Sequence, residues 1–357
     1  MVIVLGYDIG GANTKAAYVD IKNGRSPSVK VAVEYFPVWK EPDKLTRVLL
    51  TLKEQLNVGR LDAIAVTMTA ELSDAYQTKR EGVHKILDCV KVAFPTVPTF
   101  VLTTNATLIS LESAENNPLV VAAANWAATG WLVAQCINDA VVVDVGSTST
   151  SIIPIVNRHL AAQGKTDLDK LKFGELVYTG SLRTSVAAIV QSIPVKGSVV
   201  GVSSELFALS GDVHLLLGNI AEAEYTSETA DGRGKTAPEG LARLSRVVCA
   251  DTDMLNKQEI VLMAKYIYAR QIRQIASGLK KTYTYTKTLS SGRVSVVVTG
   301  LGKDFLARKA AEQVGVDAIV DLNTLLPKQT VYATPVVGLA LMAAAKLTGE
   351  PIVWKSQ

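Results

Sequence analysis

The sequence predicts a two-lobed α/β protein, and three observations carry this prediction. Residues 2–20 and 140–156 spell one pattern twice: an apolar β-branched run, an aspartate, a glycine-containing turn and a second apolar run. Along the rest of the chain, runs with strand patterning alternate with helical patterns, as is typical of α/β proteins. At 357 residues the chain is also long enough for about two domains.

The two copies match residue by residue. Superimposing Asp8 on Asp144, which lies 136 positions later (144 − 8), also places Gly10 on Gly146. In each copy the aspartate ends a strand, and small residues form a turn with uncovered backbone N–H groups. Two such turns facing each other across a cleft between the lobes would grip a polyphosphate from both sides. The two aspartates would hold Mg²⁺ through its waters.

A single Asp-x-Gly turn is common in ordinary hairpins, and the duplication is what favours a phosphate site. Asp8 and Asp144 are therefore candidate catalytic residues and candidate positioners of Mg²⁺. Lys15 would reach a phosphate, although a solvent-facing strand lysine explains it nearly as well. The candidate phosphate-binding residues are Gly10, Gly11, Asn13, Thr14, Lys15, Gly146, Ser147, Thr148 and Ser149.

The first lobe is expected to span residues 1–138. Its strands are predicted at 2–8, 14–20, 28–37, 61–68 and 99–105, and its helices at 42–56, 73–92 and 117–135. Pro42 and Asp43 favour the start of the first helix. The helix at 117–135 is apolar but falls short of the roughly 20 residues that cross a bilayer, which predicts a buried helix.

The second lobe is expected to span residues 139–333, with an insertion at 160–240 that contains short strands and an exposed glycine-rich loop. The C-terminal helix, within 334–357, is expected to pack back onto the first lobe. The segment 280–287 is predicted to form a hairpin arm rather than an RNA-binding surface. Further strands are predicted at 294–298 and 317–321, and helices at 238–249, 255–279, 303–313 and 334–347.

The composition excludes several classes of protein. Hydrophobic residues make up 48% and charged residues 20%, which describes a compact globular chain rather than a disordered one. The net charge of +4 is too small to indicate nucleic-acid binding. The three cysteines lie far apart and form neither a disulfide framework nor a metal motif. We expect a cytoplasmic protein without a signal peptide or a membrane span.

Other chemistry-bearing residues follow predicted strands. Glu71 and Asp74 come after a strand that ends near Thr69, and Glu71 is the candidate base. The alternative is that both residues are an acidic pair favoured by a helix dipole. The remaining candidates for contact with a substrate or nucleotide are Glu175, Arg183, Gly300, Gly302 and Lys303.

Seven segments carry a resemblance that spans nearly the whole chain. They are YDIGGANTK (7–15), VTMTAELSDAY (66–76), ANWAATG (124–130), VDVGSTSTSI (143–152), GELVYTGSLRT (174–184), ADGRGKT (230–236) and TGLGKDFLAR (299–308). The sequence resembles the hydantoinase/oxoprolinase branch of the superfamily of acetate and sugar kinases, chaperone ATPases and actin. Within that branch it is similar to a family linked to tetrahydromethanopterin-dependent C1 metabolism.

The resemblance implies a fold, a reaction and a set of partners. The fold is the two-lobed actin-like ATPase (ribonuclease H-like) fold, with a duplicated phosphate clamp and an interlobe cleft. The reaction is that of a transferase in methanofuran biosynthesis. It condenses an aminomethyl-furan-methyl diphosphate with the phenol of a tyramine- or tyrosine-derived acceptor and releases diphosphate. The partners are these small molecules and Mg²⁺, with no nucleic acid or membrane, and a homo-oligomer is compatible with the chain.

Two alternatives stay open at this point. In the first alternative the chain is an ATP-dependent small-molecule kinase or a hydantoinase/oxoprolinase-type ATPase, with ATP as its cofactor. In the second it is a nucleotide-driven switch that makes no chemical product. The late strand of the superfamily ends in paired glycines, whereas here Leu301 separates Gly300 from Gly302, which leans toward an organic diphosphate.

Overall fold

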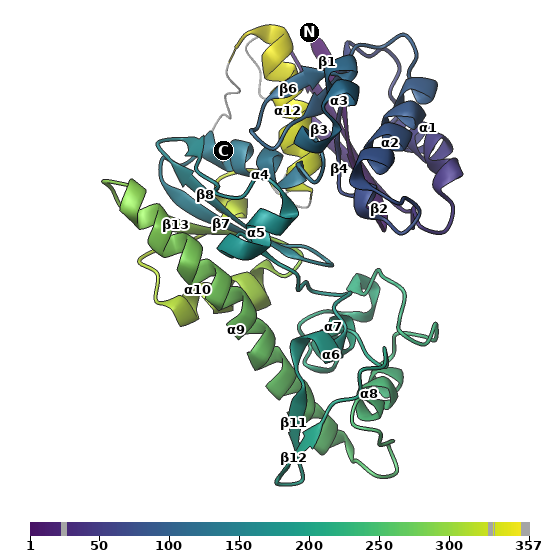
Figure 1. The fold of residues 1–357 in the computed structure, drawn as a ribbon, viewed down its shortest axis with the longest axis vertical. Helices are drawn as coiled ribbons and strands as arrows, with labels where there is room; N and C mark the ends of the chain where they lie inside the picture. Colours follow the sequence, from purple (N-terminus) through teal and green to yellow (C-terminus); the bar gives the residue numbers. More distant parts are fainter. Residues whose placement is uncertain (23–26, 328–330, 332, 351–357) are drawn as a thin grey trace. The chain divides into compact units, whose positions relative to one another are not determined.

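The computed structural model describes residues 1–22, 27–327, 331 and 333–350. The chain divides into two compact units. Unit 1 comprises Met1–Ala140, Ile153–Lys170 and the residues from Leu322 onward, and unit 2 comprises Val141–Ile152 and Leu171–Asp321. Each unit has its own sheet flanked by helices (Figure 1).

The sheet of unit 1 is centred on β1, which runs parallel to β4 on one side and antiparallel to β2 on the other. Every residue of β1 after Val2 is buried, because helices cover both faces of the sheet. The strand order is β3-β2-β1-β4-β5-β6. The strands are β1 Val2–Ile9, β2 Asn13–Ile21, β3 Ser28–Tyr35, β4 Ala63–Met68, β5 Thr99–Leu102 and β6 Leu108–Ser110.

One face of this sheet is covered by α1 (Leu45–Gln55) and α2 (Lys79–Ala93), whose apolar residues join Tyr7 and Ile9 in one core. The predicted helix at 73–92 starts too early. It begins at Lys79 because the Thr78 hydroxyl caps it by accepting a hydrogen bond from the Glu81 N–H. The short helices of unit 1 are η1 Pro42–Lys44, η2 Ala70–Leu72, α3 Leu111–Asn116, η3 Pro118–Val120 and η6 Leu322–Thr324.

The other face is covered by α12 (Thr334–Thr348), which packs on β1, β2, β4 and α4 (Asn125–Ala134). The predicted continuous helix at 117–135 is wrong. The chain turns through Ala123, whose φ of +52° is left-handed, before α4 begins. The predicted helix at 334–347 is present as α12, and residues 351–357 lie outside the described residues.

The sheet of unit 2 repeats the strand order of unit 1. Its path is β10-β8-β7-β13-β14, with β9 paired to β8 off this path. In each sheet three earlier strands lie on one side and later strands on the other, three of them in unit 1 and two in unit 2. The prediction of a duplicated α/β fold is confirmed. The strands are β7 Ala140–Val145, β8 Thr150–Val156, β9 His159–Leu160, β10 Leu176–Val177, β13 Ser295–Gly300 and β14 Ile319–Asp321. By the division above, β9 and the part of β8 from Ile153 onward belong to unit 1, although both pair within this sheet.

The longest helix of unit 2 is α9 (Lys257–Leu289), which packs on α10 and on β11 (Figure 1). The predicted end at 279 and the hairpin arm at 280–287 are both wrong. Leu279, Tyr283 and Thr286 extend its buried stripe at helical spacing. The remaining elements that follow β9 are α5 Asp167–Phe173, α6 Val186–Ile189, the hairpin of β11 Ser192–Val195 and β12 Ser198–Gly201, α7 Ser210–Leu216, η4 Glu222–Glu224, α8 Ala237–Arg246, a π-helix at Lys303–Ala307 and α10 Arg308–Val314.

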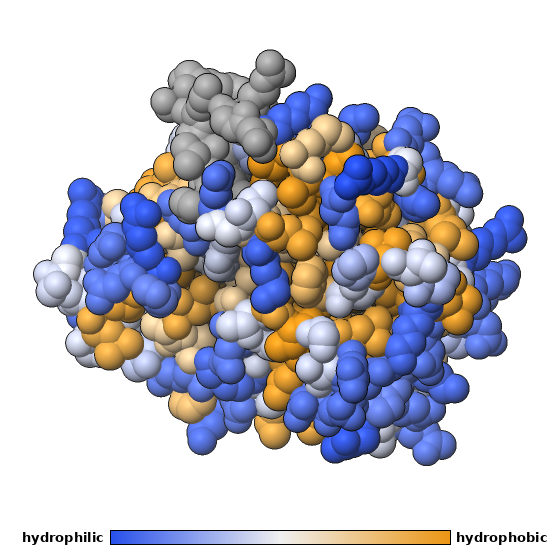
Figure 2. All heavy atoms as spheres, turned by 90° about the horizontal axis from the view of Figure 1, so that it is seen from above, coloured by the Kyte–Doolittle hydropathy of each residue, from blue (hydrophilic) through white to orange (hydrophobic). Residues whose placement is uncertain are grey.

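The surface mixes hydrophobic and hydrophilic side chains. On the face seen in Figure 2, hydrophobic residues reach the surface in several places with hydrophilic residues between them. Such a mixture is ordinary, because apolar atoms make up more than half of a folded protein's accessible surface. Among the described residues, no helix is both long enough and apolar enough to span a bilayer.

The contact between α12 and α4 gives a first prediction. A Cβ added at Gly338 would lie 2.5 Å from the carbonyl oxygen of Ala128, and a backbone atom cannot move away cheaply. We expect Gly338→Ala to lower the free energy of unfolding by at least about 1 kcal/mol, despite the higher helix propensity of alanine. Gly59→Ala is the control, because nothing lies within 4 Å of its added Cβ. Equal urea midpoints for the two variants would contradict this packing.

Candidate active site

The first aspartate turn joins β1 to β2 in unit 1. Asp8 is buried near the end of β1, and the Gly10 N–H donates a hydrogen bond to the carbonyl oxygen of Asn13 at 3.0 Å. A Cβ at Gly10 would stand 2.7 Å from that same oxygen, so only glycine fits the turn. Lys15 lies opposite Asp8 in the register of the two strands. Residues paired in this way have their side chains on the same face of the sheet.

The second turn joins β7 to β8 in unit 2 and makes the same bond. The Gly146 N–H donates to the carbonyl oxygen of Ser149 at 2.9 Å, as Gly10 does to Asn13. Asp144 is half-buried one residue before β7 ends. The match between the copies in sequence is therefore also a match in backbone geometry. That the two turns face each other across a cleft stays a prediction.

The end of β13 lies against the second turn. Gly300 has a left-handed φ of +87°, and a Cβ there would stand 2.5 Å from Oδ1 of Asp144. The Gly302 N–H donates to the carbonyl oxygen of Val145 at 3.1 Å. Gly300 therefore gives the Asp144 carboxylate space that a side chain would fill, whereas a Cβ at Gly302 would meet the Val145 side chain at 2.5 Å. This places Gly300 beside Asp144 and Gly302 beside Val145, the next residue of the strand.

The segment 179–183 packs on the opposite end of the second turn. The Ser181 N–H donates to the carbonyl oxygen of Gly146 at 2.9 Å, and the Arg183 N–H donates to that of Ser147 at 2.9 Å. A Cβ at Gly180 would stand 2.6 Å from backbone atoms of Ser147 and Thr148. The Arg183 guanidinium reaches the Thr148 hydroxyl at 3.3 Å. Arg183 is thus brought to the turn, as its candidate role requires.

Glu71 lies at the same edge of its sheet as the first turn. The Thr69 N–H donates to the carbonyl oxygen of Ile9 at 2.9 Å, and Glu71 follows two residues later in η2. Its side chain is 1% exposed. Within the described part of the chain, neither of its carboxylate oxygens has a hydrogen-bond partner. Such a buried carboxyl group favours its protonated form.

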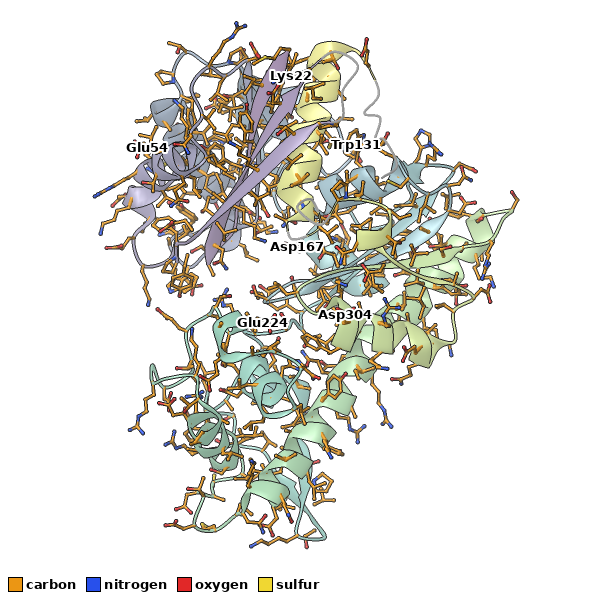
Figure 3. The ribbon with its side chains drawn as sticks, turned by 180° about the vertical axis from the view of Figure 1, so that it is seen from behind. Lys22, Glu54, Trp131, Asp167, Glu224 and Asp304 are labelled. Carbon is orange, nitrogen blue, oxygen red and sulfur yellow. The ribbon has the colours of Figure 1, made fainter. Side chains whose placement is uncertain are left out.

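Lys79 is the cation nearest to this carboxylate. Its Nζ lies 3.6 Å from Glu71 and 2.8 Å from Asp167, a residue labelled in Figure 3 at the start of α5. Burial raises the pKa of Glu71 from its ordinary value of 4.5 to about 7, and Lys79 offsets part of the rise. A carboxyl group with this pKa can accept a proton near neutrality.

The other predicted residues have less distinctive surroundings. Asp74 is exposed, and Thr14 is buried inside β2 opposite Ile9. Glu175 is buried, and its carbonyl oxygen accepts from the Ile152 N–H. Lys303 is held by Asp321 at 2.5 Å and by the exposed Asp304 at 3.2 Å, the latter labelled in Figure 3. The charge of Lys303 is therefore balanced within unit 2.

The sequence prediction missed Lys79, Asp167 and Gly180. Lys79 carries a signal in hindsight, because Thr78 followed three residues later by Glu81 is a helix-start pattern that puts Lys79 in the first turn of α2. Asp167 lies 88 residues from Lys79, and no local pattern joins two residues so far apart. Gly180 matters through its missing Cβ, which only coordinates reveal.

The aspartate turns suit a Mg²⁺ ion held by one or two carboxylates and by waters, rather than a metal site built only from protein side chains. Among the residues that the structure describes, no group of three or more His, Cys, Asp or Glu side chains forms a metal cluster. Mg²⁺ commonly binds through one or two carboxylates together with waters and substrate phosphates. Asp144, with the space left by Gly300, offers such a carboxylate in unit 2, and Asp8 offers one in unit 1.

Comparison with known proteins decides the family. The family model of hydantoinase/oxoprolinase proteins matches residues 62–346. The chain belongs to this family. The match covers α2, both strands beside the second turn and α12 up to residue 346, so it includes the second turn and Glu71 but not the first turn. The family predicted from the seven segments is confirmed.

Two curated relatives carry the same name. The (4-{4-[2-(gamma-L-glutamylamino)ethyl]phenoxymethyl}furan-2-yl)methanamine synthase of Methanocaldococcus jannaschii is 38% identical over 350 residues, which is 97% of each chain. The synthase of that name from Methanococcus vannielii is 34% identical over 212 residues, which is 59% of this chain and 93% of the relative.

A solved structure supports the fold. Nucleotide-free acetone carboxylase has a TM-score of 0.53 at 10% identity, covering 95% of this chain and 70% of that chain. The predicted fold class, the α/β actin-like ATPase fold, is confirmed by this neighbour together with the repeated sheet order.

The raised pKa of Glu71 predicts a pH-dependent cost to stability. Between pH 4.5 and about 7 the folded state binds this proton and the unfolded state releases it, so stability falls as pH rises through that window. Glu71→Gln removes the cost and leaves Lys79 paired with Asp167. We expect the variant to be more stable than the wild type at pH 8, by on the order of 3 kcal/mol, and equal to it near pH 4.

Urea unfolding at the two pH values measures this difference. Glu112→Gln, at an exposed position in α3, is the control. A Glu71→Gln variant that is less stable than the wild type at pH 8 would show that Glu71 is ionised and well paired in the folded state.

Proposed function

We propose that the chain is a transferase that forms an ether bond in methanofuran biosynthesis. It joins the methylene carbon of an aminomethyl-furan-methyl diphosphate to the phenol oxygen of a tyramine-type acceptor and releases diphosphate. The observation that carries the proposal is the 38% identity with the M. jannaschii synthase over 97% of both chains.

The relative's name defines the bond and the acceptor. Its product is a furan-2-yl methanamine with a phenoxymethyl substituent, so an oxygen bridges a phenyl ring and the furan methylene. The phenyl ring carries a gamma-glutamylaminoethyl group. For this chain we therefore propose gamma-glutamyl tyramine as the acceptor.

The reaction balances with one base and one leaving group. The phenol oxygen forms a bond to the furan methylene carbon, and the bond from that carbon to the diphosphate oxygen breaks. The electron pair of the broken bond leaves with the diphosphate. The phenol proton passes to a base, and we assign this role to Glu71. Its burial and its pKa of about 7 support the assignment, because the group is poised to take up a proton near neutral pH.

Charge on the departing diphosphate has to be stabilised. The backbone N–H groups at the tips of the two aspartate turns are proposed as its donors, with Arg183 beside the second turn as a cation. Asp8 and Asp144 would hold Mg²⁺. When bound, this ion would offset the negative charge of the diphosphate. A furan-stabilised methylene cation forms readily once its leaving group is neutralised, so this stabilisation would supply much of the catalysis.

The first test is product formation by the purified protein. We expect the furan diphosphate and gamma-glutamyl tyramine to give the ether and one diphosphate without ATP, measured by mass spectrometry and a diphosphate assay. Asp8→Asn and Asp144→Asn should each lower turnover by roughly 10² to 10³-fold. Asp43→Asn, at an exposed position in η1, is the matched control.

Each other outcome of this test has a meaning. Product that forms only with ATP, with release of ADP, would replace the proposal by an ATP-dependent kinase or ATPase. Near-native turnover of both aspartate variants, with product still formed, would remove the turns from the site.

A second test addresses the base. With Glu71 as the proton acceptor, kcat/KM should rise with pH and level off above about pH 7, since the carboxyl group must first lose its own proton. Glu71→Gln should remove this limb and lower the plateau by roughly 10² to 10⁴-fold. Asp74→Asn, three residues away at an exposed position, should leave the profile unchanged. If Asp74→Asn removes the limb instead, the two carboxylates exchange roles.

A further inference from the structure

A line of buried polar side chains crosses unit 2. His214 on α7 and Gln271 on α9 are both fully buried, and they are joined by a 3.0 Å hydrogen bond from ring nitrogen Nε2 to amide oxygen Oε1. Asn219 lies 3.1 Å from the other ring nitrogen, Nδ1. The His214 ring also contacts the rings of Phe305 and Tyr268. In such apolar surroundings each of these hydrogen bonds is costly to lose.

The direction of every bond in this line follows from one carbonyl group. The Gln271 Nε2 donates to the carbonyl oxygen of Gly180 at 2.8 Å, and a carbonyl oxygen only accepts. Oε1 of Gln271 must then face His214, whose Nε2 carries the proton. The bare Nδ1 accepts from the Asn219 amide. Burial lowers the pKa of His214 to about 4, so the ring is neutral and this tautomer is the stable one.

The line ends on the second aspartate turn. Gln271 also donates to the Thr179 hydroxyl at 2.9 Å, so its single amide group holds two successive residues of the 179–183 segment. The Thr150 hydroxyl, at the start of β8, donates to the carbonyl oxygen of Thr179 at 2.7 Å. Gly180 lies directly on the backbone of Ser147 and Thr148. A shift of Gln271 would therefore displace the backbone of the turn.

The helix itself has no need of a glutamine here. Positions four apart along the buried stripe of α9 are Ile267, Gln271, Ile275 and Leu279. An aliphatic residue at 271 would continue this stripe without the cost of burying an amide.

We infer that Gln271 is a positioning residue for the second aspartate turn. Its two donated bonds hold Thr179 and Gly180, and so keep Gly180 against Ser147 and Thr148. This contact sets the shape in which the turn receives diphosphate. The identity of the ligand rests on the proposed function. The path from Gln271 through Gly180 to the turn does not.

Gln271→Leu tests the inference, because leucine fits the stripe and removes both bonds. We expect the KM for the furan diphosphate to rise about tenfold, while the KM for the phenolic acceptor stays unchanged. Gln274→Leu is the matched control, since this half-buried amide one turn later reaches only the carbonyl oxygens of Ala188 and Ile189. It should change neither KM.

A second variant guards against a leucine variant that does not fold. Thr179→Val keeps the shape of the side chain and removes only one acceptor of Gln271. It should raise the same KM by a smaller factor. Equal increases in both KM values, accompanied by a lower unfolding temperature, would show a merely structural role and overturn the inference.

Nuclear magnetic resonance separates failure of this inference from failure of the proposed function. In the wild type, His214 should carry its proton on Nε2. In Gln271→Leu, the backbone amide resonances of Ser147 and Thr148 should shift, with or without a ligand, while Gln274→Leu leaves them in place. Unmoved resonances overturn the inference even if the ether forms. A wild type that makes no ether refutes the proposed function, and the resonance comparison still decides the role of Gln271.

Discussion

Close approach of backbone to backbone is the constraint on which both turns depend. Gly10 and Gly146 each donate to the carbonyl oxygen three residues later, and the first of them has no room for a Cβ. The same constraint recurs around the second turn, where Gly180 and Gly300 lie against it without side chains. Because glycine has no side chain, peptide groups and the Asp144 carboxylate approach one another more closely here than other residues would allow.

The two copies keep the turn and differ in what surrounds it. In unit 1 Lys15 lies opposite Asp8, and the neighbouring parallel strand β4 leads to the buried Glu71. In unit 2 the corresponding strand ends in glycines, and a polar segment held by Gln271 covers the turn. One copy therefore supplies a titratable group and the other supplies a rigid polar frame.

Much of the fold could be predicted because its signals are local or repeated. The matching residues around Asp8 and Asp144 predicted the duplication, and the pattern of apolar and β-branched residues predicted most of the strands. The end of α9 was missed because tyrosines and threonines are typical of strands, yet their buried stripe keeps helical spacing. The glycine-rich loop at 227–240 is mostly exposed, as predicted, but the fully buried Arg243, which pairs with both Asp231 of the loop and Asp212 of α7, could not be foreseen. Pairings over such distances leave no mark in a local pattern.

The position of α12 has a consequence for how the protein is made. Unit 1 needs this last described helix to cover β1, β2 and β4, whereas the sheet of unit 2 is complete once β14 has been synthesised. A ribosome reaches α12 after every strand of both sheets has been made. While the chain is being translated, the sheet of unit 1 therefore exposes the apolar face that α12 later covers. Unit 1 is begun first and completed last.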